Sequence, residues 1–229
     1  MTEVSKIGQT TAASVGQQQT QMKAEEKIKI FEGMTVSDVE RNGSEAQKLV
    51  AKAFDSQGVK PTKANEYSGA DGKYSEREAE DFNNYTFALD KNTRELRAHN
   101  KKTGCTSIIK YNDLEELQDN AALLKQASRL KGGTITYDFR NKTTTFDGVS
   151  TGRGSLHVAS RGKNDKVIVR NSDVNRIDAF SYKGNIQLEN VKNLGTFWDS
   201  PTKITMRNDA TIQTDSQSQV EIRRVGPKE

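Results

Sequence analysis

The sequence predicts an α+β module followed by an all-β C-terminal part that forms a short parallel β-solenoid. Helix-capping patterns and apolar residues at helical spacing occur before residue 131, whereas short alternating runs rich in Thr, Val and Ile recur after it. The composition agrees, because only 32% of the residues are hydrophobic and 7% are aromatic, which suits an elongated fold with a thin core. An antiparallel β-sandwich is the alternative for the C-terminal part.

Three segments follow from this reading. Residues 1–26 are rich in Gln, Thr, Ser and Ala and predict a flexible arm, either a docking segment that orders on a partner or a solvated tail. Residues 27–130 predict a small α+β module with a helix–loop–helix and short strands. Residues 131–229 predict a solenoid of about five coils.

The first half of the module predicts two helices. The alternation in residues 27–31 indicates a short strand before them. A helix then begins at Ser44, where Gln47 completes a capping box, and its apolar stripe precedes the breakers Gly58 and Pro61. A second helix begins at Ser75, with Glu78 in the matching position of its own capping box.

The second half of the module changes period. Residues 85–89, 95–97 and 106–110 alternate in polarity and predict three short strands joined by turns. A third helix follows, capped by Asn112 or Asp113.

The C-terminal repeat carries the fold prediction. Residues 167–171, 186–190 and 204–208 share the pattern apolar, any, apolar, charged, Asn, with starts 19 residues apart (167 to 186) and 18 apart (186 to 204). Weaker members occupy residues 144–148 and 220–224, and a second short run lies within each period at residues 177–180, 194–197 and 211–214. Successive coils are expected to stack in parallel, about 4.8 Å apart.

An asparagine closes each of the three strongest repeats. Asn tolerates a positive φ and hydrogen-bonds through its side-chain amide, so Asn171, Asn190 and Asn208 are expected to stack as an asparagine ladder at one corner. This pattern resembles the asparagine ladders of right-handed parallel β-helix proteins over about 90 residues (134–224). The resemblance implies an architecture and no particular family.

Catalysis is not expected. Some β-helix proteins cleave acidic polysaccharides, and Asp173, Arg176 and Asp178 are the candidates for such a role. No period contains an insertion long enough to wall a cleft, so we predict no enzyme and no catalytic residue. The two histidines, His99 and His157, are far apart in the sequence, and His157 is expected to point to the surface.

One loop resembles the second half of an EF-hand. Asp71, Ser75 and Glu78 would be the metal ligands of this loop. Tyr67 and Gly69 stand where acidic ligands belong, so we predict a degenerate loop that binds Ca²⁺ weakly or not at all. No other cofactor is expected.

The function expected from these features is that of a non-catalytic structural, adhesive or assembly protein with an N-terminal docking arm. Its partner is expected to be another protein or a second copy of the chain. The alternative is a carbohydrate-binding or carbohydrate-active protein, which would need outward aromatic residues; the candidates are Tyr137, Tyr182, Phe197 and Trp198.

Charge and hydropathy exclude some partners. The net charge of +4 is modest and intermixed with acids, so no nucleic-acid partner is expected. No apolar run approaches the ~18 residues that cross a bilayer, and no secretory signal is visible. The chain is expected to be soluble; its compartment stays open, export or surface association included.

Overall fold

The computed structural model describes residues 28–55, 72–158, 165–179, 184–192, 202–206, 211–214, 216 and 220–224. The chain divides into two compact units, Met1–Leu89 and Asp90–Glu229. The predicted arm, Asp71, Asn208 and the aromatic residues Tyr182, Phe197 and Trp198 lie outside the described residues.

The first unit contains the helices α2 (Val36–Asn42), α3 (Glu45–Phe54) and α4 (Glu76–Asn83), followed by the strand β1 (Tyr85–Asp90). Each helix begins at a capping box, in which the side chain before the helix and the side chain of its third residue satisfy each other's backbone N–H groups. The helices predicted to begin at Ser44 and Ser75 are confirmed. Helix α2, capped by Thr35, was not predicted.

Aromatic side chains form the core of the first unit. Phe54 from α3 makes edge-on contacts with Phe82, Tyr85 and Phe87, with ring centroids 5.3, 5.2 and 5.7 Å away. All four side chains are buried. Such pairs add stability beyond the area that they bury, so the fold of this unit depends on α3 contacting α4 and β1.

The short strand predicted for residues 27–31 was wrong, since the described residues 28–31 belong to no strand. The Asn83 side chain takes the place of a neighbouring strand: its Oδ1 accepts from the Ile30 N–H at 3.0 Å, and its Nδ2 donates to the Ile30 carbonyl at 2.7 Å. A side-chain amide thus satisfies backbone groups that the alternating pattern assigned to a sheet.

A mixed sheet begins the second unit. Strands β2 (Glu95–Asn100) and β3 (Thr106–Lys110) are antiparallel, β3 and β4 (Thr134–Asp138) are parallel, and β4 and β5 (Thr143–Asp147) are antiparallel. Helices α5 (Leu114–Asn120) and η1 (Ala121–Ser128) connect β3 to β4. The strand predicted at residues 106–110 and the helix capped by Asp113 are confirmed.

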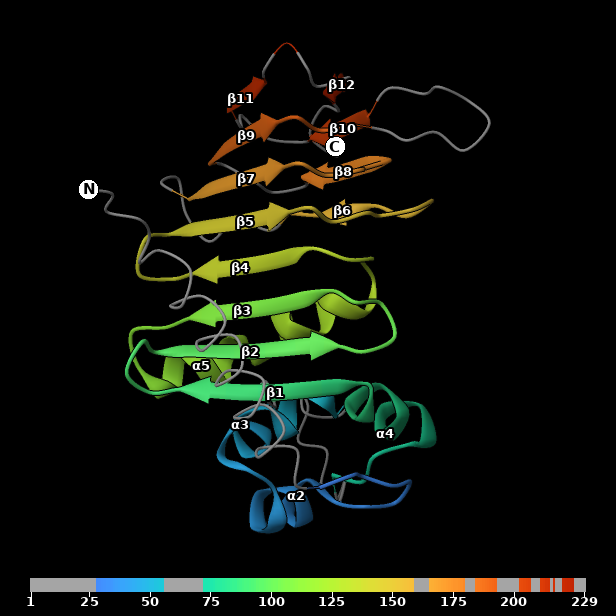
Figure 1. Cartoon of the computed structure of the whole chain (residues 1–229), viewed down its shortest axis with the longest axis vertical. Coiled ribbons are helices and arrows are strands. Elements are labelled where there is room, and N and C mark those ends of the chain that lie inside the picture. The colour runs from blue at the N-terminus through green and yellow to red at the C-terminus, as the bar shows by residue number, and fades with distance from the viewer. Residues whose placement is uncertain are drawn as a thin grey trace, which may run out of the picture. The chain divides into compact units, whose positions relative to one another are not determined.

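After β5 the pairing becomes wholly parallel and the chain alternates between two sheets (Figure 1). The first sheet continues with β7 (Lys166–Arg170), β9 (Asn185–Glu189) and β11 (Thr211–Thr214). The second sheet has the order β12 (Val220–Arg224), β10 (Thr202–Met206), β8 (Arg176–Ala179) and β6 (Leu156–His157). The α+β class and a β-rich part with parallel strands are confirmed, and these parallel registers do not fit an antiparallel sandwich.

The predicted register of the last repeats was wrong. Ile204 of β10 lies opposite Ile177 of β8, whereas the residue opposite Ile186 of β9 is Ile212 of β11. The sequence alignment had placed Ile204 with Ile186, and with it Asn208 with Asn190. The reason is physical: strands of both sheets bury every second side chain, so the alternation does not tell which sheet a strand joins.

Candidate functional site

The inward side chains of the two sheets form straight columns. In the first sheet the register aligns Val167 with Ile186, and in the second it aligns Leu156, Ile177 and Ile204. These five residues are at most 2% exposed. In-register stacking therefore gives a thin apolar core, to which each strand contributes one or two side chains.

A third run of backbone pairs in parallel outside the two sheets. Isolated parallel bridges join Ser150 to Asp173 and Asp173 to Lys192. The Thr151 N–H donates to the Asp173 carbonyl at 3.0 Å, and the Val174 N–H donates to the Lys192 carbonyl at 3.0 Å. The backbone at residues 150, 173 and 192 thus adds a third set of parallel contacts, where the sequence predicted two or three short strands per period.

The corner after β7 and β9 carries a ladder of side chains. Asn171 and Asn190 have φ of 50° and 51°, the left-handed region that Asn tolerates better than most residues. Asn190 Nδ2 donates to Asn171 Oδ1 at 3.1 Å, and Asn171 Nδ2 donates to Asp147 Oδ1 at 3.1 Å. The bond between the two asparagines is the one that the sequence predicted. The first member, Asp147, was missed because it stands opposite Arg170, one position before the corner at which the alignment placed the asparagines.

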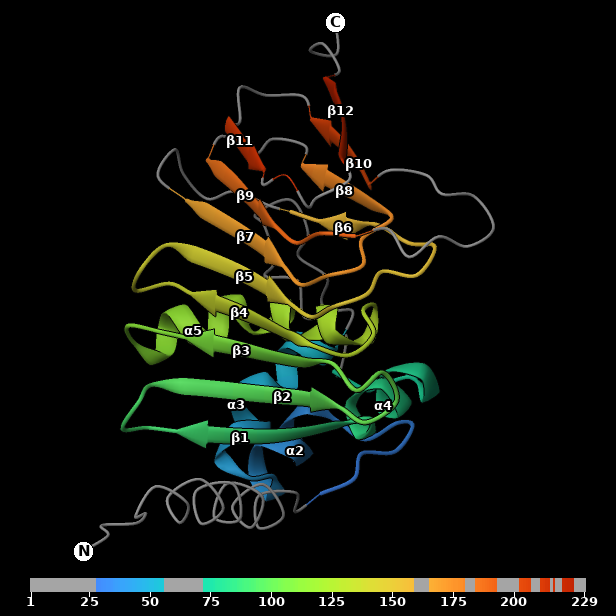
Figure 2. The same ribbon diagram turned by 45° about the horizontal axis from the view of Figure 1, so that its top comes forward.

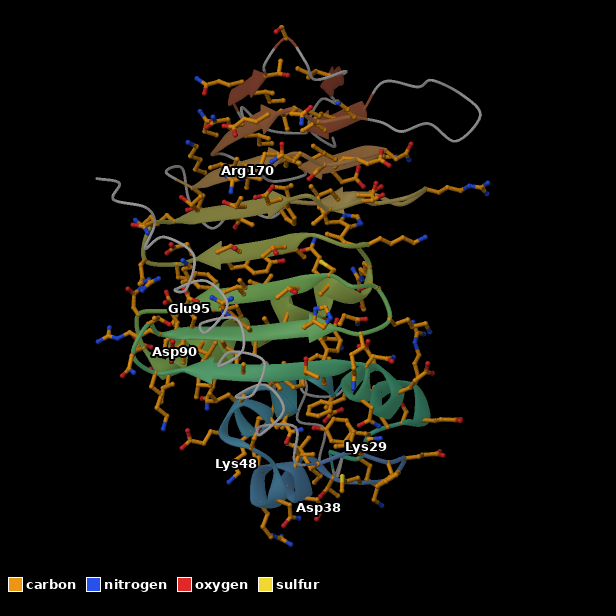
Figure 3. All side chains as sticks on the ribbon, viewed as in Figure 1. Lys29, Asp38, Lys48, Asp90, Glu95 and Arg170 are labelled. Atoms are coloured by element: carbon orange, nitrogen blue, oxygen red, sulfur yellow. The ribbon has the colours of Figure 1, made fainter. Side chains whose placement is uncertain are left out.

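Asp147 is also the electrostatic centre of this corner. Arg170, labelled in Figure 3, donates to Asp147 Oδ2 through Nε at 2.9 Å and lies 2.8 Å from it through Nη2. Burial raises the pKa of the Asp147 carboxyl, but the hydrogen bonds from Asn171 and Arg170 outweigh it, so the pKa lies below its usual range. The carboxylate therefore stays charged and bound within the corner.

The candidate catalytic residues bind each other or their neighbours. Asp178 accepts a hydrogen bond from Arg176 Nε and lies 3.7 Å from His157 Nδ1. Asp173 stands on the third run, where Ser150 Oγ donates to it at 3.4 Å. His157 is exposed between the buried residues Leu156 and Val158, as predicted.

The EF-hand-like loop is described only from Gly72 onward. Gly72 has a φ of +61°, and Glu78 Oε2 accepts from the N–H and the hydroxyl of Ser75, both at 2.8 Å. In this arrangement the carboxylate caps α4. Within the described residues no group of three or more His, Cys, Asp or Glu side chains could hold a metal ion. The weak or absent Ca²⁺ binding stays a prediction.

The two ends of the second sheet differ. At the β6 end, Gln126 of η1 donates to the His157 carbonyl at 3.4 Å, and the Tyr137 hydroxyl bonds to the same glutamine. At the β12 end, Ile222 continues the column of Leu156, Ile177 and Ile204, yet 45% of it is exposed whereas those three are fully buried. This end presents the partly exposed Ile222 side chain, and Figure 2 shows β12 at the edge of its sheet.

Comparison of the chain with protein-family models, with curated proteins and with solved structures found no match. Among the described residues, no helix has the length and apolar character needed to cross a membrane.

Proposed function

We propose that this chain is a non-catalytic structural protein that acts by assembly, and that its C-terminal half is a short parallel β-solenoid. The observation that carries the proposal is the alternation of strands between two parallel sheets, with β5, β7, β9 and β11 in one and β6, β8, β10 and β12 in the other. A chain that contributes one strand to each sheet per turn forms stacked coils.

The bonding of several carboxylates to neighbouring cations supports a structural role. Asp147 is bound by Arg170 and Asn171, and Asp178 is bound by Arg176. Glu95, labelled in Figure 3, follows the same rule: Arg97 Nη2 lies 2.8 Å and Lys110 Nζ 3.1 Å from its carboxylate. Burial raises the pKa of Glu95, but Arg97 and Lys110 lower it by more, so the pKa lies below its usual range. Carboxylates held in this way have little freedom to take up a proton from a substrate.

Assembly through a protein partner or a second copy is the mode of action that we propose, because the ends of a stack of strands are templates for association. The test is the mass of the full chain by size-exclusion chromatography with light scattering, from about 5 to 200 µM, a range that reveals weak dimers. We expect a mass of at least two chains of 25.5 kDa. A single-chain mass throughout would overturn self-assembly.

The N-terminal arm is tested in the same experiment. A variant that lacks residues 1–26 is compared with the full chain at equal concentration. If the deletion reduces an assembled species to a single chain, the docking contact lies in the arm. If the assembly persists, the contact lies within residues 27–229.

The carbohydrate alternative stays a prediction. Of the four aromatic residues named for it, the structure describes Tyr137, which is 6% exposed and offers no stacking surface. We expect no saturable binding of neutral or acidic oligosaccharides in calorimetric titration of the full chain. Binding that is lost on Trp198→Ala would favour the carbohydrate function instead.

A further inference from the structure

We infer that the β12 edge binds a second copy of this chain, with the two β12 strands antiparallel about a twofold axis at Ile222. This inference rests on the proposed function and names the partner and the contact. It draws on three features of the second sheet: an uncovered core residue, a strand edge and the charge order of β12.

The uncovered core residue is Ile222. The register places it on the same column as Ile204 and Ile177, which are fully buried by the strands on either side of them. Ile222 has β10 on one side and no described strand on the other, and 45% of it remains exposed. A column of this kind is completed when another strand covers its last member.

The strand edge supplies the backbone contacts. β12 pairs with β10 over five positions, from Thr202 with Val220 to Met206 with Arg224. No other described strand pairs with β12. Backbone N–H and C=O groups of such an edge strand accept an added strand, and the added hydrogen bonds supply affinity.

The order of the charged residues along β12 favours a second copy of this chain as the partner strand. Its sequence is Val220, Glu221, Ile222, Arg223 and Arg224. In an antiparallel pair centred on Ile222, position 221 of one copy stands opposite position 223 of the other, a glutamate against an arginine, twice per dimer. A parallel pair in register would set Glu against Glu and Arg against Arg, which is unfavourable for directly opposed charges.

The β6 end of the sheet favours contact between two β12 strands over contact between β12 and β6. At β6 the side chain of Gln126 from η1 donates to the His157 carbonyl, so one backbone acceptor of that edge is already bonded. A head-to-tail stack would need that end to accept β12. Pairing of β12 with itself is isologous and closes at two chains.

The experiment uses the full chain and three variants of β12, with dimer dissociation measured by sedimentation velocity. Ile222→Lys places a charge at the twofold axis and is expected to abolish the dimer. Glu221→Arg opposes two arginines and is expected to weaken dimerisation at least about tenfold, since like charges in an interface are costly. The double variant Glu221→Arg/Arg223→Glu restores the opposed charges and is expected to return the dissociation constant to within about threefold of the wild type.

The matched control is Leu114→Lys, which changes another exposed apolar residue of the same unit, 53% exposed on α5. It is expected to leave dimerisation unchanged. Far-UV circular dichroism and melting of every variant distinguish a lost contact from a lost fold.

The outcomes separate this inference from the proposed function. Assembly that persists in both Ile222→Lys and Glu221→Arg leaves the proposed function standing and overturns the β12 contact. Weakening by Glu221→Arg that the double variant does not reverse also overturns the antiparallel register. A wild-type chain that stays single up to 200 µM overturns self-assembly, and the β12 contact with it.

Discussion

We predict that Asn190→Ala destabilises the protein more than Asn190→Gly does. Its φ of 51° lies in the left-handed region, and its amide donates to Asn171 at 3.1 Å. Asn190→Gly removes the side-chain hydrogen bonds but keeps a residue that adopts this φ freely. Asn190→Ala removes the same bonds and also forces a β-carbon into the left-handed conformation.

The magnitudes follow from these two differences. Loss of an exposed side-chain hydrogen bond costs about 0.5–1 kcal/mol, at the low end because water replaces it. The left-handed conformation costs an alanine about 1 kcal/mol more than a glycine, the conformational entropy of glycine in the unfolded chain included. Asn190→Gly should therefore destabilise by about 1 kcal/mol and Asn190→Ala by about 2 kcal/mol.

The matched control is Asn92, which is exposed in a turn of the same unit and is not among the described residues with positive φ. There the order should reverse, with glycine less stable than alanine by a few tenths of a kcal/mol. Urea unfolding of the four variants, followed by circular dichroism, measures both orders. If Asn190→Ala is as stable as Asn190→Gly, the left-handed corner is refuted.

Three further predictions concern single sites. Added Ca²⁺ should leave the melting temperature unchanged, because the Glu78 carboxylate caps Ser75; a saturable rise that Glu78→Gln abolishes would contradict this. The lowered pKa of Asp147 contributes stability that is present above the unfolded pKa, near 4, and is lost as the pH falls through the folded value, so Asp147→Asn should flatten the acid limb of stability against pH. If Asp147→Asn leaves the loss of stability at acid pH unchanged, the hydrogen bonds of Asp147 with Arg170 and Asn171 are not the cause of the lowered pKa. Lys142 has a φ of 51° in the β4–β5 turn, so Lys142→Gly should raise stability by about 0.5–1 kcal/mol in urea unfolding, and a decrease would contradict the strain.

Local signals allowed several features to be predicted. The capping boxes at Ser44 and Ser75 and the strand at residues 106–110 depend on neighbouring residues, which a sequence displays directly. The bond between Asn171 and Asn190 was also predictable, since both residues follow strands of the same pattern.

Long-range pairing was beyond the sequence pattern. β9 pairs with β11 rather than with β10, the next strand along the chain, because the chain returns to the first sheet only after β10. Both candidates carry the same alternation of apolar residues, so periodicity could not choose between them. The role of Asp147 was missed because the predicted ladder contained only asparagines, whereas Asp147 contributes a carboxylate.

The proposed stack of coils is tested most directly by disulfide formation between β9 and β11. Gln187 and Gln213 are register partners on neighbouring parallel strands, where Cα atoms lie about 5 Å apart, within the span of a disulfide. The comparison pair is Gln187 with Thr205, which the sequence alignment made equivalent and which the structure assigns to different sheets. The native Cys105 is buried, and burial raises the pKa of its thiol to about 12, so it should not compete. Under mild oxidation, Gln187→Cys/Gln213→Cys should cross-link within the chain and Gln187→Cys/Thr205→Cys should not. Cross-linking of the second pair in preference to the first would contradict the stacked coils.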